Sequence, residues 1–223
     1  MNRVIPIPMP TAHAFLIVGE RTVLVDSGNP GNEKLILGAL EKHNIKPQDL
    51  SLILLTHGHW DHLGSAKAIQ AVTKTPIALH QADLALARAG QDKLKPYGFV
   101  SSLLEPYFSS KRFTPLEPDI LLNGTETLET YGVNAKLIET PGHTKGSVSV
   151  LLENGEAVIG DVLRGDFVFE NRPNWHFFYD DPSIVRSSIK KLLDLKLTTL
   201  FVGHGKPFSF QSLQHRFTKQ VEA

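Results

Sequence analysis

A dense cluster of histidines directly follows an apolar run in the first quarter of the chain. The strand-like sequence LILLT leads into HGHWDH at residues 57–62. Side chains two apart in an extended segment point the same way, so His57 and His59 can bind one ion together. Asp61 and His62 would begin the next helix and face a second position. Imidazole and carboxylate are ligands that zinc, iron and manganese accept at neutral pH. The motif therefore predicts a metal site at the mouth of a buried strand.

Bulk composition narrows the classes of protein that remain. A chain of 223 residues suits one domain over 1–223. Its 23 basic and 23 acidic residues balance, which argues against nucleic acid or an anionic membrane as partner. There is no cysteine, which excludes disulfides and thiolate metal ligands and fits a cytoplasmic protein. No apolar stretch is long enough to span a bilayer, and the proline-broken N-terminus does not resemble a signal peptide.

Short apolar runs separated by turn signals alternate with helical patterns along the chain. We expect strands at residues 14–18, 22–26, 52–56, 76–79, 120–122, 126–130, 135–140, 147–152, 157–160 and 199–202. We expect helices after residue 32, over 61–72 and 81–89, from 181, and over 211–221. The stretch from 80 to about 118 mixes a helical pattern with aromatic residues, and we interpret it as a helical insertion over the core.

Three further polar residues stand at strand ends, each beside a glycine that lets the backbone turn sharply. They are His143 in PGHT, Asp161 in GD and His204 in GHG. With the first cluster they make five histidines and two aspartates, enough for two ions with positions left for water and substrate. The segments 19–26 and 155–161 also resemble each other, which suggests two similar halves whose strand ends face a common groove.

The order of these motifs resembles that of the metallo-β-lactamase-fold hydrolase superfamily, from residue 26 to residue 204. The resemblance implies an α/β fold, a four-layer αββα sandwich with the metal site along one edge of its two sheets. It implies two divalent metal ions, with Zn²⁺ preferred over Mn²⁺ or Fe²⁺. The first ion would be held by His57, His59 and His143, the second by Asp61, His62 and His204, with Asp161 bridging them.

The implied activity is metal-dependent hydrolysis of a small molecule. A hydroxide held between the ions would attack an ester, thioester or lactone carbonyl, since metal ions lower the pKa of bound water toward neutrality. Asp61 would be the catalytic residue that orients the hydroxide and carries its proton to the leaving group. Asp26 and Thr144 are candidates for orienting the imidazoles, although Asp26 suits a strand-end turn equally well.

Four other histidines are not expected to bind metal. His13 and His80 are expected behind the metal ligands, whereas His43 and His215 are expected at the surface.

Where this chain departs from the motifs of known subfamilies, the range of expected activities becomes narrower. β-Lactamases of the common subclasses use a cysteine ligand, and the remaining subclass lacks the bridging aspartate. Glyoxalase II enzymes share all seven ligands but carry a C-terminal helical domain, and only 19 residues (223 minus 204) follow His204 here. Acyl-homoserine lactonases carry a tyrosine where this chain has Arg164. The pattern is closest to single-domain hydrolases of the glyoxalase II and lactonase types.

Two other reaction classes of the same fold stay open. Persulfide dioxygenases hold a single iron and consume oxygen, and they need fewer ligands than this chain offers. Phosphodiesterases of the fold should show a basic surface, against which the neutral composition argues.

Substrate contacts are expected from the insertion and from the aromatic stretch after residue 161. The candidate substrate-binding residues are Trp60, Arg164, Trp175 and His176. The same aromatic residues would also serve core packing, or a contact between two copies in a homodimer.

Overall fold

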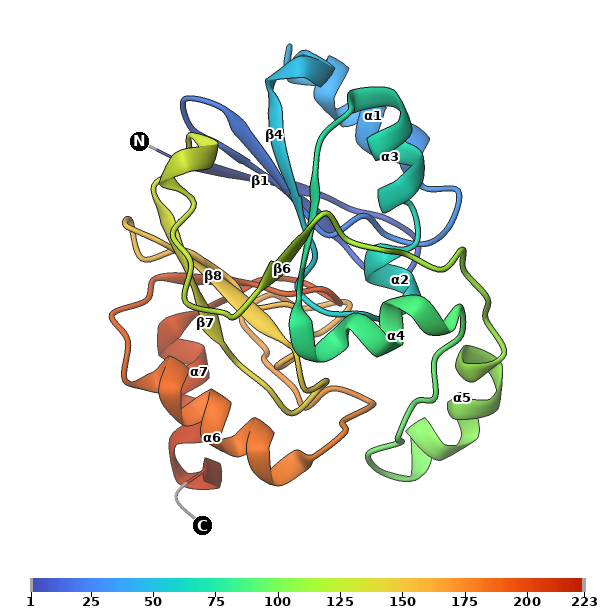
Figure 1. Ribbon diagram of the computed structural model, residues 1–223. Helices are drawn as coiled ribbons and strands as arrows, with labels where there is room; N and C mark the ends of the chain where they lie inside the picture. Colours follow the sequence, from blue (N-terminus) through green and yellow to red (C-terminus); the bar gives the residue numbers. More distant parts are fainter. Residues whose placement is uncertain (1, 222–223) are drawn as a thin grey trace.

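The computed structural model describes residues 2–221 and contains two β-sheets that pack face to face, with helices on both outer faces (Figure 1). In the first sheet the strands run in the order β1 (Arg3–Ile7), β2 (Ala14–Val18), β3 (Thr22–Val25), β4 (Leu50–Leu54), β5 (Ile77–His80) and β6 (Ile120–Leu122). In the second the order is β11 (Phe208–Ser209), β10 (Thr199–Phe201), β9 (Ala157–Val158), β8 (Val148–Leu152) and β7 (Ala135–Glu139).

Helices connect the strands and cover the sheets. The α-helices are α1 (Glu33–Lys42), α2 (Trp60–Leu63), α3 (Ala66–Thr73), α4 (Leu84–Ala89), α5 (Phe99–Ser109), α6 (Pro182–Leu193) and α7 (Phe210–Val221). The 3₁₀ turns are η1 (Pro47–Asp49), η2 (Gln81–Asp83) and η3 (Glu129–Tyr131). Within residues 2–221, no helix is both long enough and apolar enough to cross a bilayer.

Three apolar clusters separate the four layers. The first joins α1 and α3 to the outer face of the first sheet, where Ile36 and Ile69 pack with Ile53. The second fills the space between the sheets, and the third joins the second sheet to α6 and α7 through residues such as Ile189 and Phe217. Apolar layers on both faces of each sheet are the αββα arrangement, so the expected fold class is confirmed.

Strand β4 is buried on both faces, which explains its uninterrupted apolar sequence. Leu52 and Leu54 point into the cluster between the sheets, whereas Ile53 and Leu55 point toward the helices. β4 pairs in parallel with both β3 and β5, so it lies in the middle of the first sheet. Its carboxyl end therefore opens at the edge of the sandwich, where residues 57–62 follow.

The strand expected at 126–130 is wrong. This segment makes only one isolated bridge, between Thr127 and Lys136, and continues into η3. The Glu126 carboxylate accepts hydrogen bonds from the backbone N–H groups of Asn123, Gly124 and Thr125, at 2.7–3.0 Å. These bonds hold residues 123–126 in a turn just before the segment. Within it, the Tyr131 and Gly132 N–H groups donate to the Leu128 and Glu129 carbonyls at 2.9 Å, so the chain coils instead of extending.

The helix expected over 61–72 is two helices, α2 and α3, which meet at Gly64 and Ser65. A Cβ at Gly64 would overlap Pro30, so only glycine lets the two backbone segments come this close. The Ser65 hydroxyl donates to the Asn29 carbonyl at 2.6 Å, and it accepts from the Asn32 N–H at 2.8 Å. These contacts anchor the break to the loop before α1.

Strands β1 and β11 were not anticipated from the sequence. β1 contains Pro6, which cannot donate to a ladder, but β1 is the edge strand of its sheet and pairs only with β2. Proline is tolerated on such an edge. β11 has two residues, too few for a periodicity to show.

The expected helical insertion corresponds to the crossover between β5 and β6, which pair in parallel. It contains η2, α4 and α5, and Figure 1 shows α5 at the periphery of the molecule. The apolar side chains of Phe99, Leu103 and Tyr107 on α5 are exposed. A homodimer contact at this segment stays a prediction.

Candidate metal centre

The strand ends of both sheets deliver polar side chains to one edge of the sandwich. His57 and His59 follow β4, and α2 carries Asp61 and His62. From the second sheet, His143 follows β7, Asp161 follows β9 and His204 follows β10. The backbone links the two sheets here, because the Val148 N–H donates to the Thr56 carbonyl at 2.9 Å. The structure thus brings all seven predicted ligands together.

The first predicted group converges on one point. His59 Nδ1 lies 2.9 Å from His143 Nε2, which lies 3.2 Å from His57 Nε2. The three ligand nitrogens all lie within 4.8 Å of one another, which is close enough for them to bind a single ion. All three side chains are buried. Burial lowers the pKa of His59 and that of His143 to about 3, and it lowers the pKa of His57 well below its usual value. Each imidazole is therefore neutral at pH 7, with a lone pair available for a metal.

The second predicted group lies beside the first. His204 Nε2 is 3.4 Å from Asp61 Oδ2, and His62 completes a set of ligand atoms within 4.8 Å of one another. Burial lowers the pKa of His62, but Asp161 and Asp26 on either side raise it by more, so the net pKa is well above the usual value. A proton held between two carboxylates is what a bound cation would replace.

Asp161 occupies the centre of both groups. Its Oδ2 lies 3.4 Å from His143 Nε2, 3.3 Å from His62 Nε2 and 3.2 Å from His204 Nε2. Burial raises the pKa of Asp161, but His204 and His62 lower it by more, so the carboxyl is ionised at neutral pH. One carboxylate oxygen close to ligands of both groups is suited to bridge two ions.

Hydrogen bonds behind the imidazoles set their ring orientation. The Nδ1–H of His62 donates to Asp26 Oδ2 at 2.8 Å, and that of His143 donates to the Phe178 carbonyl at 2.8 Å. His204 Nδ1 lies 3.0 Å from the Thr11 carbonyl. These bonds make Nδ1 the donor of each ring and leave Nε2 facing Asp161, the position from which it would bind a metal.

Two buried atoms test whether this site fits a metal. His62 Nε2 and Asp161 Oδ1 are both buried and have no hydrogen-bond partner. An unpaired buried polar atom is costly in a folded protein. Neutral imidazoles and carboxylates are the donor set of divalent transition metals. The residues present therefore fit two such ions.

The orienting roles expected from the sequence are realised in part. Asp26 contacts His62 and also accepts from the N–H and hydroxyl of Thr56. Thr144 does not contact an imidazole, because its hydroxyl donates to Asp83 at 2.6 Å. His13 Nε2 donates to the Gly205 carbonyl at 3.0 Å, and His80 Nδ1 accepts from the Ala82 N–H at 3.2 Å. Within residues 2–221, neither ring is hydrogen-bonded to a predicted ligand.

A cavity of about 180 Å³ opens onto the centre. It is lined by Pro10, Thr11, His59, Trp60, Asp61, Leu94, Leu104, Phe108, His143, Asp161, Phe167, His176, Phe177, Phe178 and His204. Trp60 and His176, two of the four candidate substrate-binding residues, lie in its wall. Leu94, Leu104 and Phe108 come from the insertion, which therefore shapes the cavity.

The other two candidates lie elsewhere. The Trp175 indole N–H donates to Gln220 at 2.9 Å, and its ring packs 5.1 Å from the Phe217 ring. Arg164 lies behind the wall, with its guanidinium 4.5 Å from the centre of the Phe177 ring. The structure places neither side chain in contact with the cavity.

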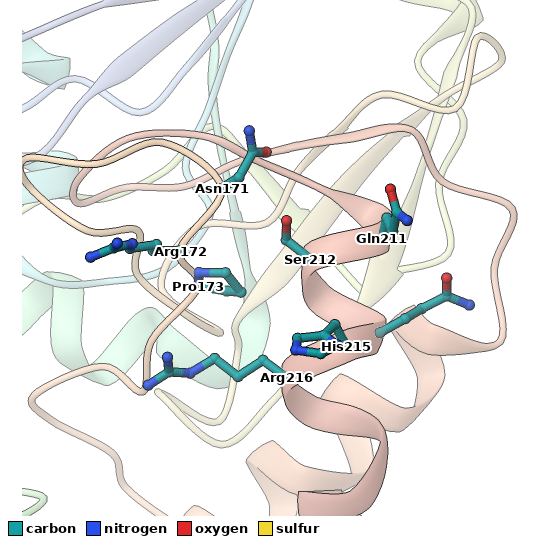
Figure 2. Close-up of a pocket in the computed structure, with 8 residues that line it drawn as sticks. Asn171, Arg172, Pro173, Gln211, Ser212, His215 and Arg216 are labelled. Atoms are coloured by element: carbon teal, nitrogen blue, oxygen red, sulfur yellow. The ribbon is translucent and has the colours of Figure 1, made fainter.

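A larger hollow of about 930 Å³ lies between residues 171–173 and α7 (Figure 2). Arg172 lines it from the loop and Arg216 from α7. His215 also lines it and is exposed, as expected. None of the predicted metal ligands borders this hollow, so it is separate from the candidate centre.

Two aspartates near the centre were not singled out from the sequence. Asp83 accepts from the N–H groups of Gly58 and Gly146, at 3.0 and 2.7 Å, and so joins the two ligand-bearing loops. Asp92 accepts from the Trp60 N–H at 3.0 Å. Both come from the insertion, and no local pattern marks them as partners of loops far along the chain.

Gly203 allows the second sheet to approach the ligands closely. A Cβ at this position would overlap Asp161 Oδ1 and lie 2.6 Å from His62 Cε1. We expect Gly203→Ala to displace both side chains and to lower the affinity for at least one metal ion by tenfold or more. Metal analysis after dialysis measures this. Gly38→Ala is the matched control, because its Cβ meets no atom within 4 Å. Equal metal content in the two variants would contradict the geometry.

Asp92 should make stability depend on pH. Burial raises its pKa to about 7, and its Oδ1 has no hydrogen-bond partner. The unfolded chain releases this proton near pH 3.9, so the folded state binds it more tightly and loses stability as pH rises from about 4 to 7. We predict that Asp92→Asn removes this loss. Relative to wild type, its free energy of unfolding should be larger (the variant more stable) at pH 8 than at pH 5, by roughly 2 kcal/mol.

Urea unfolding at the two pH values measures this difference, with the exposed Asp194→Asn as the control for loss of one charge. An identical pH profile for Asp92→Asn and wild type would show that Asp92 is ionised throughout the range.

Comparison with known proteins agrees with this geometry. The family model described as the metallo-beta-lactamase superfamily matches residues 10–204. The probable metallo-hydrolase MJ0888 of Methanocaldococcus jannaschii is 29% identical over 201 residues, which cover 88% of this chain and 88% of that protein.

Solved structures share the fold. The BLEG-1 B3 metallo-beta-lactamase has a TM-score of 0.72 at 23% identity, covering 98% of this chain and 99% of that one. TTHA1623, solved in a di-iron-bound form, has a TM-score of 0.68 at 24% identity, covering 96% of this chain and 98% of that one. The resemblance predicted from the motifs is confirmed, and the chain belongs to the metallo-beta-lactamase superfamily.

Proposed function

We propose that this protein is a metal-dependent hydrolase that uses two divalent ions to cleave an ester, thioester or lactone bond in a small molecule. The position of Asp161 carries the proposal. Its Oδ2 lies 3.4 Å from His143 of the first group and 3.2 Å from His204 of the second. A carboxylate shared by two ligand groups is suited to hold two ions side by side, as a two-metal hydrolytic mechanism uses them.

The chemistry divides between the ions and the chain. Two bound ions would lower the pKa of water to near neutrality and polarise the carbonyl oxygen under attack. Asp61 lies in the cavity wall, with its Oδ2 3.4 Å from His204 Nε2. From there its carboxylate can accept the proton of the attacking water and deliver it to the leaving group. Asp26 and the Phe178 carbonyl keep the imidazoles that surround the reaction in one tautomer.

The cavity wall favours a neutral carbonyl compound over a phosphodiester. As far as residues 2–221 define it, the lining contains no lysine or arginine. Leu104, Phe108 and Phe177 instead present apolar surface near the centre. A charged phosphate would lose water there without gaining a side-chain cation, whereas a small acyl group would bury apolar area.

Zinc is the metal we propose, with manganese and iron as alternatives. Histidine and carboxylate ligands suit all three. The di-iron form of TTHA1623 supports iron as the main competitor. The name of MJ0888, probable metallo-hydrolase, supports hydrolysis as the reaction.

Metal analysis followed by a substrate panel tests this proposal. We expect protein purified without chelator or added metal to contain close to two ions per chain. We also expect it to hydrolyse at least one member of a panel of short-chain esters, thioesters and lactones, with loss of activity in EDTA and recovery on adding metal. One iron per chain, with oxygen consumed in the presence of a persulfide, would overturn the proposal in favour of a dioxygenase.

Asp61→Asn tests the proton-transfer role. An amide cannot accept the proton, and general acid–base groups contribute about 10²–10⁴-fold to rate. We expect kcat to fall within that range in protein that is reloaded with metal and whose metal content is measured. Asp194→Asn, on the exposed end of α6, should keep the wild-type kcat. A metal-loaded Asp61→Asn protein with wild-type kcat would assign proton transfer to another group.

A further inference from the structure

His176 lies as close to the centre as the predicted ligands do. It is buried, and it comes from the loop that precedes α6 rather than from a strand end. Its Nε2 lies 3.3 Å from Asp161 Oδ2. The corresponding distances for His143 and His204 are 3.4 and 3.2 Å. By distance alone, His176 cannot be told apart from the predicted ligands.

The ring of His176 neighbours a ligand of each group. Its centre is 4.6 Å from that of the His143 ring and 5.1 Å from that of the His204 ring. The nearest donor atoms of His143, Asp161 and His176 lie within 4.8 Å of one another. These three side chains can therefore bind one common ion.

The backbone also orients His176 as it orients His143. The Phe178 carbonyl lies 2.8 Å from His143 Nδ1 and 3.2 Å from His176 Nδ1. A carbonyl oxygen has two lone pairs and can accept from both rings. The Phe178 N–H also lies 3.3 Å from His176 Nδ1, so the Phe178 backbone holds this edge of the ring and leaves Nε2 facing Asp161. A backbone carbonyl beside Nδ1 is a typical partner of a metal-bound histidine.

We infer that His176 is an eighth protein ligand of the metal centre, binding through Nε2 to the ion held by His143 and Asp161. The inference rests on the proposed two-metal function and replaces the substrate-binding role expected for His176. With His57 and His59, the first ion would then have five protein donors. That number exceeds the four of a tetrahedral site, so the first ion would be five- or six-coordinate, whichever of zinc, manganese or iron is bound.

Titration of metal-free protein with Co²⁺ tests this inference without relying on activity. Four-coordinate Co²⁺ absorbs visible light strongly, and six-coordinate Co²⁺ absorbs it weakly. We expect wild type to bind two ions. We expect His176→Gln to bind one of them at least tenfold more weakly and to absorb more strongly per bound ion, because the coordination number falls. His176→Leu is titrated in parallel, so that the result does not depend on one replacement.

Two further variants separate the possible failures. His215→Gln, on the exposed face of α7, should match wild type in both affinity and spectrum. His59→Gln should bind Co²⁺ more weakly whether or not His176 is a ligand, because His59 is one of the predicted ligands. The inference would be overturned if either folded His176 variant bound Co²⁺ with the affinities and spectrum of wild type while His59→Gln bound it more weakly. The proposed function would then stay intact. If His59→Gln also bound like wild type, the metal centre itself would be wrong. Thermal melting of each metal-free variant establishes that it is folded.

Discussion

The structure at the edge of the sandwich where the strand ends meet depends on one constraint, the burial of polar side chains around Asp161. Imidazoles and carboxylates removed from water must be paired or must bind a cation. Asp161 meets this need for ligands from both sheets, with His62 and His143 each within 3.4 Å of its Oδ2. Strand ends far apart in the sequence therefore have to converge on one point. His204 and His62 keep the carboxyl of Asp161 ionised, whereas burial keeps the His143 ring neutral.

Two other buried carboxylates hold the ligand-bearing loops in place. Asp26 connects β3 to Thr56 and to His62, and so anchors the loop after β4. Asp83, in η2, connects that loop to the loop after β7 through backbone N–H groups. Both carboxylates thus bind backbone as well as side chains of the loops that carry the predicted ligands. The insertion that contains Asp83 also supplies Phe108 to the cavity wall, so one segment contributes to both the centre and the pocket.

Local sequence predicted the layers and the ligands far better than it predicted the pocket. The apolar run of β4 and the helical periodicity of α6 indicated their elements, because each pattern repeats over several residues. The segment 126–130 was misjudged because the chain turns at the Glu126 carboxylate just before it and coils into η3 within it. In the aromatic stretch 175–179, neighbouring residues split between cavity and core, and composition alone does not separate them. Trp175 packs against Phe217, whereas His176 faces the centre.

The sequence by itself determined the superfamily, the order of most of the elements and the seven residues that meet at the centre. Their residue types and spacing within short motifs encode the chemistry locally, and glycines mark the turns after the strands. Tertiary structure alone decided that His176 stands 3.3 Å from Asp161, that Arg164 lies behind the cavity wall, and that the Thr11 and Phe178 carbonyls orient imidazoles. Every residue carries a carbonyl, and contacts between distant loops arise only when the sheets pack. No local pattern can therefore reveal which carbonyl or loop side chain reaches the centre.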